Sequence, residues 1–147
     1  MSAGKLHLRI ITPSRVMFEG EVDMVIARAY EGEVAFLYNH IPITLTLDYG
    51  LMRIMQGDET HRAAVLGGIV ELYDNRITVI SERAEWANDI DTARAREEKE
   101  QAERQIRELT DRNEIYQAQL TMRRSAVRLE VSSYAVTKGH GVSGSGK

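Results

Sequence analysis

Three arginines in the C-terminal part of the chain have the side-chain type and spacing to bind a polyanion. Arg94 lies in one predicted helix, and Arg124 and Arg128 lie one turn apart on one face of the next. Antiparallel pairing about a turn near residues 111 and 112 would place Arg94 roughly opposite Leu129, close to the other two arginines. Planar guanidinium groups bind phosphate in a bidentate manner, and crowded arginines need carboxylates or a bound anion between them. The spacing therefore predicts either a phosphate-binding cluster or a salt-bridge network.

The remaining residues do not form a recognisable catalytic set. The four histidines, His7, His40, His61 and His140, are scattered along the chain, without a serine or metal-spaced partner. With no cysteine, the chain has no thiolate nucleophile, disulfide or Cys-based zinc site. It also lacks a glycine-rich phosphate loop followed by Lys-Ser/Thr. We therefore expect no catalytic residue and no metal site, and no hydrolysis of any nucleotide that binds.

Composition limits the class of protein further. The chain has 147 residues, of which 43% are hydrophobic and 28% are charged, as is typical of a soluble globular protein. The net charge of -3 gives no field that would attract nucleic acid or anionic lipid. No apolar segment is long enough to cross a bilayer, and residues 1–8 lack the apolar core of a signal peptide. We expect a cytoplasmic protein that reaches a membrane only through its partners.

Short segments of alternating apolar and polar residues dominate the first half of the chain. Leu6, Leu8 and Ile10 alternate with His7 and Arg9, the period of a half-buried strand. Further strands are predicted at residues 22–29, 44–47, 51–55, 62–66, 69–73 and 76–80, with turn signals at residues 12–14, 48–50, 56–58, 67–68 and 74–75. This regular spacing predicts an N-terminal β-sandwich or flattened barrel.

The C-terminal part of the chain has the composition of helices. Residues 91–134 contain no glycine or proline, and residues 110–113 interrupt the helical pattern with types that favour caps and turns. The fold class is thus α+β, with units at 1–86 (β-sandwich), 87–136 (antiparallel two-helix hairpin) and 137–147 (disordered tail). The predicted apolar stripe is thin and consists of Ala95, Ala102, Ile106, Leu109, Ile115, Ala118, Met122, Ala126 and Leu129. Because small side chains bury little area, we expect the hairpin to detach more easily than the β domain unfolds.

Several segments occur in the order found in one known family. They are residues 8–13, 18–23, 31–33, 39–42, 67–71 and 75–80, followed by an Ala/Arg/Glu-rich helical hairpin. Together they cover about residues 5 to 134 and resemble the epsilon subunit of bacterial F-type ATP synthases. The chain departs from the family pattern at Ala35, where glycine is usual, and at Tyr38, where proline is frequent.

The resemblance implies a mechanical role without bond-making chemistry. The β domain would contact the gamma subunit of the central stalk and the membrane c-ring, with Glu33 and His40 at this end of the domain. The hairpin would change position and block rotation in the hydrolysis direction, on the cytoplasmic face of the bacterial membrane. Its basic residues would then meet acidic surface on the alpha/beta catalytic subunits: Arg104, Arg107, Arg112 and Arg123. The alternative for each of them is an ordinary solvated helix face.

The resemblance also implies regulatory ATP as a ligand of the hairpin. Residues 90–95 match the Ile/Leu-Asp-x-x-Arg-Ala motif of family members whose hairpin binds ATP. The implied site consists of Glu85, Ile90, Asp91, Arg94, Ala95, Arg124 and Arg128. Gln101 stands where strong binders tend to have a basic residue. The alternative is that Asp91 only caps the helix and Arg94 pairs with Glu97, Glu98 or Glu130.

A second class of function fits the same composition. A β-sandwich joined to paired helices is also typical of an adaptor that binds other proteins and has no connection with ATP synthesis. Only the series of motifs argues against that alternative.

Overall fold

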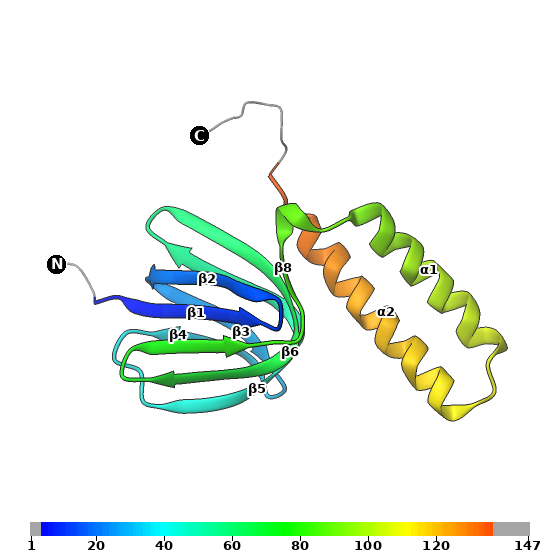
Figure 1. Cartoon of the computed structure of the whole chain (residues 1–147), viewed down its shortest axis with the longest axis horizontal. Coiled ribbons are helices and arrows are strands. Elements are labelled where there is room, and N and C mark those ends of the chain that lie inside the picture. The colour runs from blue at the N-terminus through cyan, green and yellow to red at the C-terminus, as the bar shows by residue number, and fades with distance from the viewer. Residues whose placement is uncertain (1–3, 137–147) are drawn as a thin grey trace.

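The structure, a computed structural model, describes residues 4–136 and divides into a β-rich part and two long helices (Figure 1). The tail at 137–147, predicted to be disordered, lies outside the described residues. The α+β class is confirmed, with the sandwich first and the helical hairpin second. That residues 1–86 and 87–136 fold as two separate units stays a prediction.

Eight strands build the β domain. They are β1 (Leu6–Thr12), β2 (Arg15–Val22), β3 (Met24–Ala29), β4 (Gly32–Leu37), β5 (Ile43–Gln56), β6 (Glu59–Tyr73), β7 (Arg76–Ile80) and β8 (Ala84–Trp86). Their hydrogen-bonded order is β2-β1-β7-β6-β5-β3-β4, and β8 pairs with β6. Only β1 and β7 run parallel among the paired strands of the described residues.

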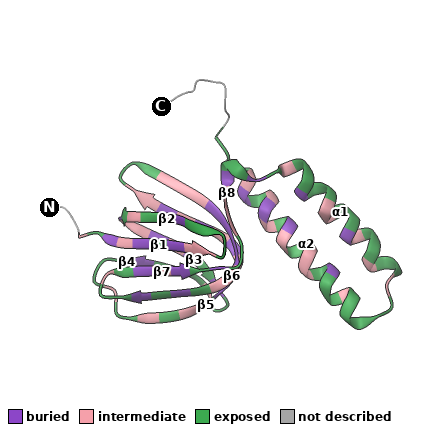
Figure 2. Cartoon of the chain, in the orientation of Figure 1, coloured by how far each residue is buried: buried purple, intermediate pink, exposed green. Residues whose placement is uncertain are grey.

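The core lies between the two layers of strands. Leu6, Leu8 and Ile10 are fully buried, as the alternation predicted, and they belong to one apolar cluster with Phe36 and Ile54. Figure 2 shows buried residues interspersed with exposed ones along the strands. Burial of large aliphatic and aromatic side chains is the main stabilising contribution to this half of the molecule.

Two segments predicted as turns are bends inside long strands. Residues 48–50 lie within β5 and residues 67–68 lie within β6, so four predicted strands are in fact two. Gly67 and Gly68 have φ angles of 82° and 125°, in the left-handed region that glycine favours. A Cβ atom on Gly68 would lie 2.2 Å from the carbonyl oxygen of Ile80. The glycines therefore let β6 bend and pass from one layer to the other.

The strand predictions also missed β4, β8 and nearly all of β2, and they merged the last residue of β2 with β3. The predicted strand at 22–29 is divided at Asp23, where β2 ends and β3 begins. Strand β2 pairs with β1 through a register shift between Ile10 and Ile11, which breaks the alternation that a sequence pattern would show. Strand β8 has only three residues and β4 has one buried residue, Phe36, so neither was predicted, and their pairing with β6 and β3 depends on tertiary contacts.

The helical hairpin consists of α1 (Thr92–Glu108) and α2 (Arg112–Ser132), and the short 3-10 helix η1 (Ala87–Asp89) precedes it. Asp91 caps α1, since its carboxylate accepts a hydrogen bond of 3.1 Å from the Arg94 amide. Asp111 caps α2 in the same way, accepting from the Glu114 amide at 3.0 Å. The break predicted at residues 110–113 is confirmed.

The buried face of α2 differs from the predicted stripe. Ala95, Ala102 and Ala118 are buried as expected, whereas Ala126 is exposed. The buried residues of α2 also include Ser125, Arg128 and Val131. The reason is that α2 packs on two neighbours, α1 and the surface of β5 and β6, so its buried face is wider than a two-helix pattern implies (Figure 1).

Candidate functional site

A groove lies between the two helices, next to the segment that joins β7 and β8. It has a volume of about 280 Å³. We call it the hairpin groove and define it by Arg83, Glu98, Gln101, Gln105, Arg124 and Arg128, which line it together with smaller residues. Two of the three arginines predicted to converge, Arg124 and Arg128, are therefore in this groove.

Arg128 is the most buried cation of the site, with only 5% of its side chain exposed. Its Nε and Nη2 atoms donate to the two carboxylate oxygens of Glu85 on β8, at 2.7 and 3.2 Å. Its Nη1 atom donates to Oε1 of Glu98 on α1, at 3.4 Å. A bidentate pair of this kind is strong and directional. It connects α2 with both α1 and the β domain.

Arg94 and Arg124 have more open surroundings. The Nε atom of Arg94 donates to Oε2 of Glu98 at 3.2 Å, and 69% of the Arg94 side chain is exposed. Glu98 thus lies between Arg94 and Arg128, one carboxylate oxygen toward each. Arg124 donates to the hydroxyl oxygen of Thr121 at 3.1 Å and forms no ion pair with any described residue. Arg124 therefore has no carboxylate partner among the described residues, and the same is true of Arg83.

The other residues of the predicted ATP site have structural roles in this conformation. Ile90 packs in a small apolar cluster with Ala64, Ala87 and Val131. Ala95 is fully buried. Asp91 is exposed and serves as the cap of α1. The salt-bridge alternative correctly gives the pair of Arg94 with Glu98, while Glu97 and Glu130 form no ion pair within residues 4–136.

The residues predicted to contact partners lie at separate places. On β4, Glu33 pairs with Arg53 at 3.1 Å. His40 is half-buried beside Phe36, with a ring-centroid distance of 6.2 Å. Arg104, Arg107 and Arg112 are exposed and are close in sequence to the turn between α1 and α2. Figure 1 shows that this turn lies away from the β domain.

Arg123 has a role that the sequence did not indicate. Its Nη2 atom lies 2.5 Å from Oδ1 of Asp48 on β5, and its guanidinium carbon lies 4.8 Å from the ring centroid of Tyr49. An ion pair and a cation–π contact therefore dock α2 on the sandwich. Sequence reasoning missed Asp48, because its segment looked like a turn, and missed Arg83, because no motif contains it.

Charge also shapes individual carboxyl groups. A hydrogen bond from Lys5, assisted by the Gly57 backbone amide, lowers the pKa of Asp23 at the joint of β2 and β3. A hydrogen bond from Lys99 lowers the pKa of Glu103 on α1. Within residues 4–136, no three acidic or histidine side chains gather as a metal would require. None of the described helices combines the length and the apolar character of a membrane span.

Comparisons with known proteins agree with this two-part architecture. A model of the β-sandwich domain of the ATP synthase delta/epsilon chain matches residues 5–87, and a model of its long α-helix domain matches residues 88–133. An ATP synthase epsilon chain from Halalkalibacterium halodurans is 38% identical over 86% of this chain and 96% of its own length. One from Nitratidesulfovibrio vulgaris is 37% identical over 88% of this chain and 97% of its own length.

Solved structures share the fold at low sequence identity. A chain of the Euglena gracilis mitochondrial ATP synthase superposes with a TM-score of 0.78 at 17% identity, over 88% of this chain and 82% of its own. A chain of the Tetrahymena thermophila mitochondrial ATP synthase, from its central stalk and c-ring, superposes with a TM-score of 0.63 at 12% identity. The match covers 90% of this chain and 99% of that chain.

The β-sandwich followed by a long helical domain, in this order and over nearly the whole chain, defines a class of ATP synthase subunits. The chain belongs to the ATP synthase delta/epsilon family, and the curated relatives that it matches are epsilon chains.

Proposed function

We propose that the chain works as the epsilon subunit of the central stalk of an F-type ATP synthase, without a catalytic centre of its own. Its β-sandwich contacts the gamma subunit and the c-ring, so rotation of the ring is coupled to ATP synthesis, on the cytoplasmic face of a bacterial membrane. Its helical hairpin regulates hydrolysis by changing position. The observation that carries this proposal is the docking of α2 on the sandwich by a small apolar cluster and a few ion pairs.

The docking contacts are of a kind that can be exchanged. The apolar part consists of Ala64, Ala87, Ile90 and Val131, which together bury far less area than the sandwich core. The ionic part uses arginines, Arg123 and Arg128, that would be released when the hairpin leaves the sandwich. Released guanidinium groups, with Arg104, Arg107 and Arg112, would suit acidic surface on the alpha/beta catalytic subunits.

One outer face of the sandwich supports the stalk contact. Four apolar residues are cross-strand neighbours on β2, β1, β7 and β6: Val16, Ile11, Ile80 and Ile69. Val16, Ile80 and Ile69 are 47%, 54% and 51% exposed. A contiguous exposed apolar row of this kind marks a protein-binding surface. We assign it to the gamma subunit, and the end of the sandwich with Glu33 and His40 to the c-ring.

We further propose that the hairpin groove binds regulatory ATP. Arg124, which has no carboxylate partner among the described residues, would take a phosphate group together with Arg83, and Arg94 and Arg128 would exchange contacts with Glu98 for contacts with phosphate. Glu85, Asp91, Ile90 and Ala95 would contact the nucleoside. A volume of about 280 Å³ is just below the usual range for ligand pockets, so the helices would move apart slightly on binding. A bound triphosphate would hold the hairpin closed.

Reconstitution tests the rotor function. The purified chain should bind a gamma subunit and lower the ATPase rate of an alpha-beta-gamma complex that lacks it, and the chain alone should show no ATPase activity. Ile80→Asp, on the exposed apolar row, should weaken gamma binding, whereas Tyr73→Asp, exposed elsewhere on β6, serves as the matched control. A chain that neither binds gamma nor inhibits would be an unrelated adaptor.

Nucleotide titration tests the groove. Adding ATP to the full chain should shift the amide resonances of α1 and α2, and Arg124→Ala or Arg94→Ala should weaken that effect at least tenfold. Arg96→Ala is the matched control, because Arg96 is exposed on α1 and forms no ion pair with the described residues. Spectra unchanged at millimolar ATP would mean that the arginines serve only as salt-bridge residues.

A further inference from the structure

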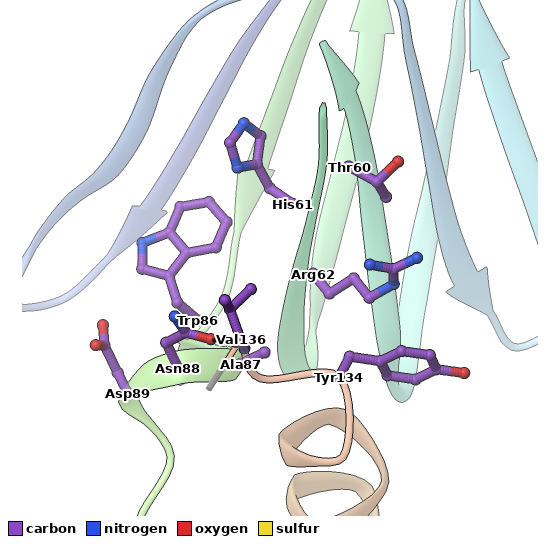
Figure 3. Close-up of a pocket in the computed structure, with 9 residues that line it drawn as sticks. All are labelled: Thr60, His61, Arg62, Trp86, Ala87, Asn88, Asp89, Tyr134 and Val136. Carbon is purple, nitrogen blue, oxygen red and sulfur yellow. Dashed lines mark hydrogen bonds between the residues drawn. The ribbon is translucent and has the colours of Figure 1, made fainter. Parts of the chain in front are cut away.

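A second cavity lies where the helical hairpin meets the sandwich, and it shares no residue with the hairpin groove. It has a volume of about 410 Å³, within the usual range for small-molecule sites. Its walls come from three places: the start of β6, the chain from Trp86 to Asp89, and the segment just after α2 (Figure 3). We call it the junction pocket.

The pocket is open because β6 extends beyond its neighbour. Strand β8 pairs with β6 only at Ala63, Ala64 and Val65, so residues 60–62 have a strand partner, β5, on one side only. The chain leaves β8 at Trp86 and turns into η1 at this point. Side chains from both faces of β6, His61 and Arg62, therefore reach the same cavity (Figure 3).

Aromatic rings form two of its walls. Trp86 is fixed by edge-on contacts with Phe18 and His61, at ring-centroid distances of 6.0 and 6.1 Å. Tyr134 lies on the other side, and the guanidinium carbon of Arg62 lies 4.7 Å from its ring centroid. Figure 3 shows Trp86 and Tyr134 on opposite sides, with Val136 between them. Flat walls of this kind suit a planar aromatic ring.

The polar groups of the pocket point to one negative charge on the ligand. Within residues 4–136, Arg62 forms no ion pair, and its Nε atom is buried without a hydrogen-bond partner. The side-chain oxygen of Asn88 accepts a hydrogen bond of 2.8 Å from the Val136 amide, which leaves the Asn88 NH₂ group free to donate. Asp89 is exposed at the rim. One guanidinium group and one nearby carboxylate favour a monoanion and disfavour a polyphosphate.

We propose that the junction pocket binds a planar aromatic monocarboxylate, with its carboxylate at Arg62, whose guanidinium group stacks on Tyr134, and its ring against Trp86 and Val136. Tyr134 and Val136 follow α2, so the pocket is complete only while the hairpin is docked on the sandwich. The ligand therefore stabilises the docked state by mass action. This site is separate from the proposed ATP site, and its test does not depend on ATP binding or on the rotor function.

Benzoate is the probe, and the full chain carries its own reporter, because Trp86 is the only tryptophan. Benzoate should change Trp86 fluorescence in a saturable way and shift the amide resonances of His61, Asn88 and the Trp86 indole. Cyclohexanecarboxylate, which has the charge without the flat ring, and benzamide, which has the ring without the charge, should each bind at least tenfold more weakly.

Substitutions in the junction pocket test the position of the benzoate site independently of the spectroscopic shifts. Arg62→Gln should weaken benzoate binding at least tenfold, while Arg76→Gln, an exposed arginine on β7, should leave it unchanged. Tyr134→Ala, outside the sandwich core, should also weaken it and guards against a folding defect in the Arg62 variant. The proposal is overturned if benzoate gives no saturable change, if benzamide binds equally well, or if the shifted amides lie around Arg83 and Arg124 instead.

Discussion

The sandwich core and the surface that docks the helical hairpin are built from different kinds of contact. The core contains many fully buried aliphatic residues and Phe36, far from solvent. The docking surface has a few small apolar residues and the ion pairs of Arg123 and Arg128. Apolar burial is non-directional and is not weakened by electrostatic screening, whereas ion pairs are directional and are screened by salt.

This difference divides the molecule into a permanent part and an exchangeable part. A large apolar core has no equally favourable alternative partner in water, so the sandwich stays folded. Arginine side chains are well solvated when released and can pair with other carboxylates or with phosphate. The following variants test the comparison, beginning with the largest expected effect.

Phe36→Ala should destabilise the sandwich by about 3–5 kcal/mol, because it removes a fully buried aromatic ring and leaves a cavity. Urea denaturation followed by circular dichroism measures the effect. Tyr30→Ala, at a position that is 65% exposed, is the control and should change stability by less than about 0.5 kcal/mol. Equal effects of the two substitutions would mean that the core does not dominate stability.

Glu85→Gln should release the hairpin without unfolding the sandwich. It leaves the buried Arg128 guanidinium with Glu98 alone, at a cost of roughly 3 kcal/mol in docking, the lower end for a buried ion pair. Hydrogen exchange of α2 amides should then become more than about tenfold faster, while exchange in β5 and β6 stays unchanged. Glu82→Gln, an exposed neighbour, is the matched control. Faster exchange in the strands as well would show that the two parts unfold together.

Arg123→Ala should weaken docking by only about 0.5–1 kcal/mol, because its ion pair with Asp48 is half exposed. The same exchange measurement detects it, and the difference from the natural chain should shrink in high salt, which screens exposed charges. Arg104→Ala, exposed near the far end of α1, should have no effect on docking. A loss that is independent of salt would assign the contact to stacking on Tyr49 instead.

The smallest effect concerns acid stability of the sandwich. Hydrogen bonds from Lys5 and Gly57 lower the pKa of Asp23 below its ordinary value of 3.8. The folded state therefore binds this proton less readily than the unfolded state, so the stabilisation is present above pH 3.8 and is lost as the pH falls through the lowered pKa. Asp23→Asn should reduce the urea midpoint slightly at neutral pH and match the natural chain at strongly acid pH. Asp58→Asn, in the turn between β5 and β6, is the control, and a difference in urea midpoint that is independent of pH would contradict the linkage.

Local patterns were sufficient for several elements. Alternation predicted β1, and the residues at 110–113 predicted the break between α1 and α2, because caps and strand faces depend on neighbours in sequence. The pair of Arg94 with Glu98 follows from a spacing of four residues in one helix.

Other features depend on contacts between segments that are distant in sequence, so the sequence pattern could not predict them. A Gly-Gly pair such as Gly67 and Gly68 looks the same in sequence whether it ends a strand or bends one. Here it bends β6, because β5 and β6 pair in the same register on both sides of it. Arg83 lines the hairpin groove, and Asp48 pairs with Arg123, because α2 packs against the sandwich. The width of the buried face of α2, with Arg128 inside it, has the same cause.

The bend at Gly67 and Gly68 has a mechanical consequence. Because β5 and β6 run through both layers, sliding one layer over the other would require breaking a continuous backbone ladder. A torque applied to one outer surface therefore reaches the opposite layer without internal slip, and the sandwich turns as a rigid block.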